Sequence, residues 1–287
     1  MQFSRSRQRF PQLRVVDSSP STNDELRGSK VPDFSIVVTD HQTAGRGRLG
    51  RSWISPAGQT LAVSVLLRPR DGAGRPVALD HIGWLPLLAG LAMAEAVEAT
   101  LQAHGSAARV GLKWPNDVQI AGLKASGILS ELDRDAVVVG AGLNVAIPAE
   151  SLPTPVSTSL ALHLGRATGS GAGRVSSAAS SDAGPSAFGP STAELCDIAL
   201  LAFLERFEEL YRRYCAHGGD ADAAGLRAEV TEACTTVGEP VLVHLPGDQR
   251  LRGTAEGIDH SGRLLVRAED GVEHAVAAGD ITHLRYE

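Results

Sequence analysis

Four short segments of strand-forming residues follow one another between residues 109 and 141, and their spacing restricts the fold. They are Arg109–Trp114, Val118–Ile120, Lys124–Leu132 and Ala136–Ala141, and only three residues separate each from the next. Turns this short join antiparallel neighbours, because a parallel crossover needs about a dozen residues or more. The spacing therefore predicts a mixed α+β sheet and excludes a doubly wound one.

Other segments complete this predicted layer structure. The β-branched runs Ser35–Asp40 and Leu61–Leu67 are typical of buried strands. Leu85–His104 is rich in Ala, Leu and Glu and is followed by Gly105, which predicts a helix ending there. Ala193–Tyr214 carries apolar residues at helical spacing and predicts a second long helix.

From about Gly238 the pattern changes to short strands separated by turn residues such as Gly262 and Gly271. Five strands within about 50 residues are typical of a small closed barrel. The strand candidates are Val241–Leu245, Leu251–Ile258, Leu264–Arg267, Val272–Ala277 and Ile281–Leu284. We therefore expect a main domain over residues 16–236 and a second domain over residues 237–287.

Two stretches are expected to lie outside the folded core. Residues 1–15 contain several arginines and no acid, which predicts a flexible N-terminal tail. Residues 165–191 consist mostly of Gly, Ser, Ala and Pro and have too few apolar side chains to offset the entropy of ordering them. We therefore predict a disordered insert at 165–191 inside the main domain.

Composition excludes several classes of protein. The net charge of −6 and the pI near 5.9 argue against a nucleic-acid binder. No apolar run approaches the roughly 20 residues that cross a bilayer, so we expect no membrane association. The three cysteines form no Cys-x-x-Cys pair, which argues against disulfides and structural zinc and predicts a cytoplasmic location.

A glycine-rich loop follows the first predicted strand. Residues 45–50 match the dinucleotide-binding pattern G-x-G-x-x-G, but that motif needs a helix directly after it, and Ser52–Leu67 is not helical. The loop carries Arg46, Arg48 and Arg51, which can hold carboxylate or phosphate, and Trp53 offers a face for stacking. The alternative is a solvated basic loop with Trp53 in the core.

Lysine and asparagine are rare enough here to single out positions. Of the 27 basic residues only Lys30, Lys113 and Lys124 are lysines, and the three asparagines are Asn23, Asn116 and Asn144. Arginine cannot replace a lysine at a site shaped for a compact ammonium group, and an asparagine offers a neutral donor and acceptor together. Five of these six residues fall in three short clusters, which favours a polar site built from them.

Each cluster also has a plain structural interpretation. Ser21 precedes a helical pattern and fits a helix N-cap. Asn116 and Asp117 fit a turn between strands, with the lysines as surface charges. If the strands on either side of residues 121–123 pair as a hairpin, however, Lys113 and Lys124 can face one cavity, with Asp117 as the natural magnesium ligand.

Taken in chain order, the motifs resemble those of the biotin–protein ligases. The order is Ser-Thr-Asn (21–23), Gly-Arg-Gly-Arg-x-Gly-Arg-x-Trp (45–53), Lys-Trp-Pro-Asn-Asp (113–117), Lys-x-x-Gly-Ile-Leu (124–129) and Gly-x-Gly-x-Asn (140–144). The resemblance implies a catalytic domain similar to class II aminoacyl-tRNA synthetases, followed by an SH3-like barrel. Only about 17 residues precede Ser18, so we expect the monofunctional type without an N-terminal DNA-binding domain and without operator binding.

The resemblance also implies roles for individual residues. The catalytic residues would be Lys124, Arg48 and Asp117. Biotin would be bound by Ser21, Thr22, Asn23, Gln42, Arg46, Gly47, Arg48 and Lys124. ATP and the adenylate would be bound by Arg51, Trp53, Lys113, Asn116 and Asn144. Asp117 would be the magnesium ligand.

The implied reaction joins biotin to AMP and then transfers it. Biotin carboxylate attacks the α-phosphate of ATP, with Mg²⁺ present, and a lysine of a biotin carboxyl carrier domain then takes the biotinyl group from biotinyl-5′-AMP. The carrier would belong to acyl-CoA or pyruvate carboxylases. The alternatives are a lipoate–protein ligase, which shares the fold and the adenylation step, and a biotin-sensing module without catalysis. The intact Lys124 and Asp117 argue against the latter.

Overall fold

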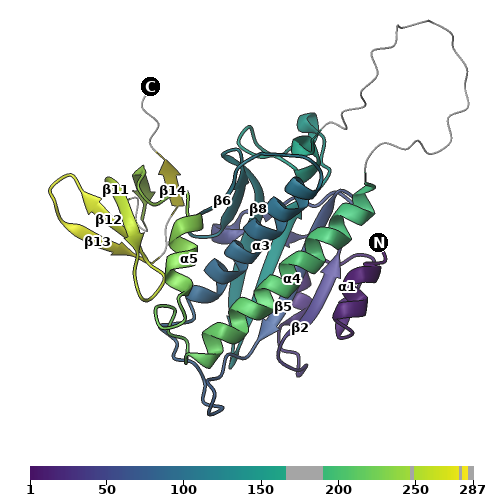
Figure 1. Cartoon of the computed structure of the whole chain (residues 1–287), viewed down its shortest axis with the longest axis horizontal. Helices are drawn as coiled ribbons and strands as arrows, with labels where there is room; N and C mark the ends of the chain where they lie inside the picture. The colour runs from purple at the N-terminus through teal and green to yellow at the C-terminus, as the bar shows by residue number, and fades with distance from the viewer. Residues whose placement is uncertain (166–189, 246–248, 278–279, 284–287) are drawn as a thin grey trace, which may run out of the picture.

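The computed structural model describes residues 1–165, 190–245, 249–277 and 280–283, which form a large sheet and a smaller one (Figure 1). The large sheet has seven strands in the order β1-β2-β5-β9-β8-β7-β6. In chain order its strands are β1 (Leu13–Val15), β2 (Ser35–Thr39), β5 (Thr60–Leu67), β6 (Val110–Lys113), β7 (Asp117–Ile120), β8 (Leu123–Asp133) and β9 (Ala136–Asn144).

The pairing of these strands follows the predicted turn lengths. β6–β7, β7–β8 and β8–β9 are all antiparallel, whereas β1 pairs with β2 in parallel. The prediction of a mixed α+β sheet is therefore confirmed. β7 pairs with β8 only as far as Gly127, and β8 continues to Asp133 beside β9.

Two long helices, α3 (Trp84–Ala103) and α4 (Thr192–Ala216), lie side by side across one face of the large sheet (Figure 1). α3 is apolar and long enough to span a membrane by length and composition, but 78% of that stretch is buried inside the protein. The opposite face carries α2 (Thr22–Leu26) and a small hairpin of β3 (Gly45–Arg46) and β4 (Ser52–Trp53), joined by the 3-10 turn Arg48–Gly50. Nearly all functional motifs lie on this second face.

The expected flexible tail at residues 1–15 was wrong. Helix α1 (Ser4–Arg9) and strand β1 occupy this stretch, and Phe3 and Phe10 are buried. The Ser6 hydroxyl donates to Asp197 Oδ1 of α4 at 2.7 Å. These two buried aromatic side chains anchor the segment to the core. The prediction considered the charges of residues 1–15 and missed them.

The predicted insert at 165–191 falls mainly on residues 166–189, which lie outside the described residues. Its last residue, Ser191, caps α4: its hydroxyl accepts from the Glu194 backbone N–H, and Glu194 Oε2 accepts from the Ser191 backbone N–H. Among the described residues between β9 and α4, Ala149–Ser151 and Leu160–His163 form 3-10 turns.

The small C-terminal sheet follows α5 (Leu226–Ala233). Its strands are β10 (Pro240–His244), β11 (Arg250–Ile258), β12 (Leu264–Ala268), β13 (Glu273–Val276) and β14 (Asp280–His283), in the order β13-β12-β11-β10-β14. All five predicted strands are confirmed. β13 and β14 end this order, and the described pairings include no ladder that closes the sheet between them.

Two tryptophans attach the C-terminal sheet to the main domain. Trp84 Nε1 donates to the His260 carbonyl at 2.7 Å, and Trp114 Nε1 donates to the Gly262 carbonyl at 3.1 Å. Both indoles are almost fully buried. The turn between β11 and β12 is thus seated on α3 and on the turn between β6 and β7.

Candidate active site

The Ser-Thr-Asn motif starts α2, and Thr22 and Asn23 are buried against the large sheet. Gln42 Oε1 accepts from the Thr22 backbone N–H at 2.8 Å and from its hydroxyl at 3.1 Å. The Ser64 hydroxyl of β5 lies 2.7 Å from Thr22 Oγ1 and 2.6 Å from Asn23 Oδ1. Four side chains from three separate parts of the chain therefore form one hydrogen-bonded network.

Glu131 of β8 lies at the far end of this network. Its Oε2 accepts from Asn23 Nδ2 at 2.7 Å, and the same Nδ2 donates to the Leu129 carbonyl at 3.3 Å. The Asn23 amide is therefore held from both ends, by Ser64 at its oxygen and by Glu131 at its nitrogen.

Three glycines of β8 and β9 leave room on the sheet for side chains from other elements. A Cβ on Gly140 would lie 2.3 Å from Asn23 Oδ1, and a Cβ on Gly142 would lie 2.5 Å from Trp53 Cε2. Gly127 pairs with Gly142 across the strands, and a Cβ there would lie 3.2 Å from Trp53 Cζ3. Gly127, Gly140 and Gly142 thus form a glycine floor on which Asn23 and Trp53 lie.

The Trp53 indole has an unused donor. Its Nε1 is buried and has no hydrogen-bond partner among the described residues. Buried donors are nearly always paired in folded proteins. An unpaired indole N–H beside the glycine floor therefore indicates a place where a polar ligand binds.

Arg46, on the hairpin above the floor, is held by two carboxylates. Its guanidinium donates to both oxygens of Asp24, at 2.5 and 2.8 Å, and to Glu131 Oε2 at 3.1 Å. The hydrogen bond from Arg46 lowers the pKa of the Asp24 carboxyl, and the same bond raises the pKa of Arg46. An incoming anion would have to compete with Asp24 and Glu131 for this cation.

Arg48 points away from Arg46 and reaches the turn between β6 and β7. Its Nη1 donates to Asn116 Oδ1 at 3.0 Å, and Asn116 Nδ2 donates to the Ile128 carbonyl at 3.1 Å. Burial lowers the pKa of the Arg48 guanidinium, and the nearby Asp117 partly opposes that shift. A partly desolvated cation of this kind interacts strongly with an anion that enters its surroundings.

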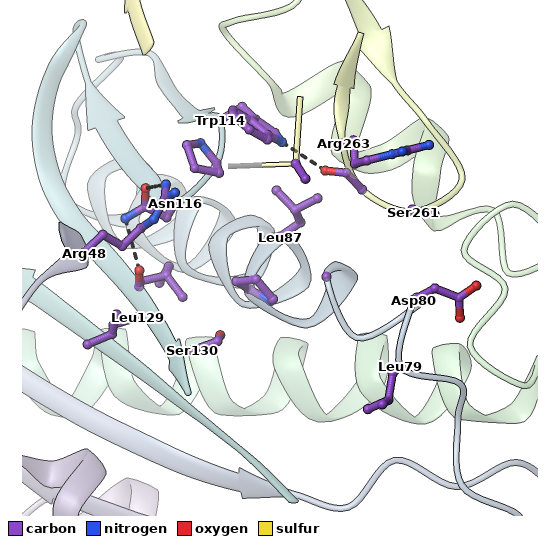
Figure 2. A pocket seen from close by; sticks show the side chains of 16 residues that line it. Arg48, Leu79, Asp80, Leu87, Trp114, Asn116, Leu129, Ser130, Ser261 and Arg263 are labelled. Carbon is purple, nitrogen blue, oxygen red and sulfur yellow. Dashed lines mark hydrogen bonds between the residues drawn. The ribbon is translucent and has the colours of Figure 1, made fainter. Parts of the chain in front are cut away.

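Arg48 and Asn116 also line a cavity of about 530 Å³ between the large sheet and the C-terminal sheet (Figure 2). Figure 2 shows them on one side, with Ser261 and Arg263 of the turn between β11 and β12 on the other and Leu87 of α3 between. The rest of the lining is Leu79, Asp80, Gly83, Pro86, Trp114, Pro115, Ile128, Leu129, Ser130, Gly262 and Ala277. Both domains therefore contribute to a hollow large enough for a small organic molecule.

Lys124 and Asp117 lie together, as the predicted hairpin requires. Lys124 Nζ is 2.6 Å from Asp117 Oδ1 and 5.9 Å from the centre of the Trp53 ring. The pair is a charge contact, since Asp117 Oδ1 has no hydrogen-bond partner among the described residues. Lys113 ends β6 directly opposite Asp117, so both lysines flank this carboxylate.

The residues around Asp117 do not fit a resident metal ion. The described residues contain no group of three or more His, Cys, Asp or Glu side chains that could hold one. The Asp117 carboxylate is already paired with the Lys124 ammonium, at 2.6 Å. Magnesium that arrives on the phosphates of a nucleotide needs only one or two protein carboxylates, so it remains compatible with this arrangement.

The other predicted residues border the same face. Asn144, two residues beyond Gly142, is buried and donates through Nδ2 to the Thr158 carbonyl at 3.0 Å. Within the loop, the Gly47 backbone N–H donates to the Arg51 carbonyl at 2.7 Å. Ser21 is buried at the N-cap of α2, as its structural interpretation predicted, although no cap hydrogen bond reaches its hydroxyl from the described backbone.

Three polar residues of this site were not expected from the sequence. Asp24 looked like an ordinary first-turn acid of a helix, Ser64 stands inside an apolar run, and Glu131 stands inside a strand pattern. A single polar residue in a buried strand was the available signal for Ser64, because such a residue needs a partner.

Comparison with known proteins agrees with this geometry. Residues 13–145 match the Biotin/lipoate A/B protein ligase family, and residues 236–284 match the Biotin protein ligase C terminal domain. The chain is similar to the biotin–[acetyl-CoA-carboxylase] ligase of Mycobacterium tuberculosis, at 36% identity over 96% of this chain and 90% of that protein. The corresponding Paracoccus denitrificans protein is 31% identical over 84% of this chain and 88% of its own length.

Solved structures give the same result. The biotin protein ligase from Aquifex aeolicus in complex with biotin and ATP has a TM-score of 0.70 and 26% identity to this chain. The match covers 96% of this chain and 100% of that one.

Proposed function

The chain belongs to the biotin protein ligases, and we propose that the glycine floor and the cations around it are where it activates biotin. It is an ATP-dependent, AMP-forming enzyme that makes biotinyl-5′-AMP and transfers biotin to a lysine of the biotin carboxyl carrier domain of acetyl-CoA carboxylase. The roles of individual residues are our proposals.

The first step brings two anions together. The biotin carboxylate oxygen forms a bond to the α-phosphorus of ATP, and the bond from that phosphorus to the β-phosphate bridge breaks, releasing pyrophosphate. Cations that neutralise both partners lower this barrier, because preorganised charge stabilises the developing charge of the transition state. Arg46, Arg48 and Lys124 are the cations on this face that would do so.

One observation carries the assignment. The glycine floor holds Asn23 and Trp53 flat against the sheet, next to Lys124, and the Trp53 indole N–H there has no partner within the described residues. We assign the ring of biotin to the network of Ser21, Thr22, Asn23 and Gln42, its carboxylate to Arg46, Gly47, Arg48 and Lys124, and ATP to Arg51, Trp53, Lys113, Asn116 and Asn144. The cavity beside Arg48 and Asn116 supports placing the nucleotide on that side.

The second step needs a neutral amine from the carrier lysine. Asp117 is placed to take the proton as that amine attacks the mixed anhydride and AMP leaves. Its Oδ1 lies 2.6 Å from Lys124 Nζ, so the proposed base and the proposed carboxylate-binding cation are neighbours. Magnesium would enter with ATP, and we do not propose a resident metal on Asp117.

A direct assay tests the activity. The protein is incubated with ATP, Mg²⁺ and either biotin or lipoate, and pyrophosphate release and labelling of a carrier domain are followed. We expect both signals with biotin and neither with lipoate. Pyrophosphate release with lipoate alone would favour the lipoate ligase alternative, and binding of biotin without pyrophosphate release would favour a sensing module.

We also propose that carrier domains of other carboxylases, including pyruvate carboxylase, are modified, and that the enzyme works in the cytoplasm. Labelling of isolated carrier domains from both carboxylases tests the first point. All three cysteines are free thiols, which supports a reducing compartment.

A further inference from the structure

We propose that Glu131 is a positioning residue for biotin, which acts by fixing the orientation of the Asn23 amide. This inference rests on the proposed function, since it assumes that Asn23 faces the biotin ring. Glu131 lies on β8, far from Asn23 in sequence, and no motif of the sequence includes it.

The donors and acceptors around Asn23 allow a single orientation. Glu131 and the Leu129 carbonyl can only accept hydrogen bonds, so the amide nitrogen must face them, at 2.7 and 3.3 Å. The Ser64 hydroxyl at 2.6 Å can then donate to the amide oxygen. If the amide flipped, its oxygen would face a carboxylate and a carbonyl, which repel it.

The burial of Asn23 restricts its amide to this orientation. Asn23 is only 3% exposed and lies on Gly140, where even a methyl group would not fit beneath its oxygen. A hydrogen bond to a charged acceptor is roughly twice as strong as one between neutral groups. Glu131 therefore provides the strongest of the contacts that hold the amide. The amide oxygen accepts one hydrogen bond from Ser64, and its second lone pair is left for an N–H of the ligand.

Glu131 also has an effect that opposes biotin binding. It also pairs with Arg46, so removing it would free part of a cation for the biotin carboxylate. The Arg46 and Glu131 side chains are 38% and 22% exposed, and ion pairs this exposed to water contribute little to stability. Arg46 also keeps its two hydrogen bonds to Asp24. The loss of Asn23 orientation should therefore dominate.

Biotin binding without ATP is the direct test, measured by titration calorimetry. We expect Glu131→Ala to raise the Kd for biotin about 10-fold or more, and Glu131→Gln to recover part of that loss, because it can still accept from Asn23 without the charge. The KM for ATP should change less than about 3-fold. Glu256→Gln, which removes a carboxylate paired with Arg267 on the C-terminal sheet, is the matched control and should bind biotin normally.

A double-mutant cycle shows whether Glu131 acts through Asn23. In an Asn23→Ala background, Glu131→Ala should change the Kd for biotin less than about 2-fold. Ser64→Ala, which loosens the other end of the amide, should weaken biotin binding in the same direction and gives a second test if Glu131→Ala does not fold.

The outcomes are separable. Wild-type protein that does not bind biotin overturns the proposed function. Wild-type protein that binds biotin, together with a Glu131→Ala variant of unchanged Kd, overturns only this inference. The inference would also be overturned if Glu131→Ala raised the Kd for biotin about 10-fold in the Asn23→Ala background too. The same holds if the Kd for biotin and the KM for ATP rose by equal factors.

Discussion

Individual glycines decide which side chains can reach the active face. Gly140 and Gly142 point to the same face of β9, because alternate residues of a strand do so. Asn23 and Trp53 occupy the space above them that a Cβ would take. The spacing Gly-x-Gly at residues 140–142 is therefore a packing requirement of this site.

We predict that Gly142→Ala lowers kcat/KM for biotin by about 10- to 100-fold, because the new methyl group would lie 2.5 Å from Trp53 Cε2 and displace the ring. Steady-state pyrophosphate release measures this. Gly72→Ala is the control, since a Cβ there meets nothing within 4 Å. Equal kinetics for both variants would contradict the role of the floor.

At the same scale, Asp117→Asn should slow transfer of biotin from preformed biotinyl-5′-AMP by about 100-fold, because the neutral amide cannot accept the proton. The measurement is single-turnover labelling of the carrier domain. Transfer at the wild-type rate would remove Asp117 as general base and leave it as a partner of Lys124.

Among the elements, the hairpin β3–β4 has the most unusual construction. Its turn places Leu49 at a φ of 56°, a left-handed conformation that is unfavourable for leucine, and exposes 73% of that side chain. Arg46 is held by Asp24 and Glu131, and Arg48 is held by Asn116. Asp24 and Glu131 thus supply counter-charges to Arg46 from the protein itself.

These counter-charges predict how the hairpin responds to change. Asp24→Asn removes the carboxylate that binds Arg46 twice, so trypsin should cleave the hairpin several-fold faster in the variant without ligand. Biotin plus ATP should restore protection in both proteins. The same cleavage rate in wild type and variant would show that Asp24 does not hold the hairpin.

The segment between β9 and α4 contains a histidine whose pKa is shifted by burial. Val156 and Thr158 hydrogen-bond to the backbone of Lys124, and Thr158 Oγ1 lies 2.7 Å from His163 Nε2. Burial lowers the pKa of His163 below its ordinary value of 6.5. The histidine in the segment that flanks Lys124 is therefore harder to protonate than a histidine in water.

Stability should consequently depend on pH through His163. As the pH falls below about 6.5, the unfolded chain takes up a proton there before the folded chain does, so the free energy of unfolding decreases. Above that pH, the contribution of His163 to the free energy of unfolding is constant. Comparing thermal unfolding of wild type and His163→Gln between pH 7.5 and 5.5 isolates this term, and identical pH dependence would contradict it.

For the whole molecule, the relation between the two sheets depends on two indole hydrogen bonds. Trp84 and Trp114 donate to carbonyls of the turn between β11 and β12, and Gly83 is so close to the Ser261 carbonyl that a Cβ would lie 2.9 Å from it. The cavity beside Arg48 lies at this junction. Its shape therefore depends on how the sheets are joined.

We predict that Trp114→Phe lowers the free energy of unfolding by about 1–3 kcal/mol, because it leaves the Gly262 carbonyl buried without its donor. Denaturant unfolding measures this. Trp53→Phe is the comparison, since Trp53 Nε1 has no described partner to lose. Equal loss of unfolding free energy in the two variants would mean that the smaller Phe ring, and not the lost hydrogen bond, causes the destabilisation.

Much of the fold and of the site of this protein can be predicted from local sequence. Turn lengths determine antiparallel pairing, β-branched runs and helical spacing locate the elements, and the motifs with the rare Lys and Asn residues identify most of the site. These are local properties, because they depend on backbone geometry and on chemistry within a few residues. The flexible tail was mispredicted because Phe10 packs against Phe34, which is distant in sequence, and such a contact cannot be inferred from the tail alone.

Only the tertiary structure could show what each motif residue touches. Residues far apart in sequence, such as Asn23 and Glu131, Arg48 and Asn116, or Trp114 and Gly262, meet only after the sheet has formed and the C-terminal turn has packed against it. A side chain's donors and acceptors are known from its type, but its partners depend on long-range packing. The sequence therefore identified the chemistry of the site, and the fold decided which groups hold that chemistry in place.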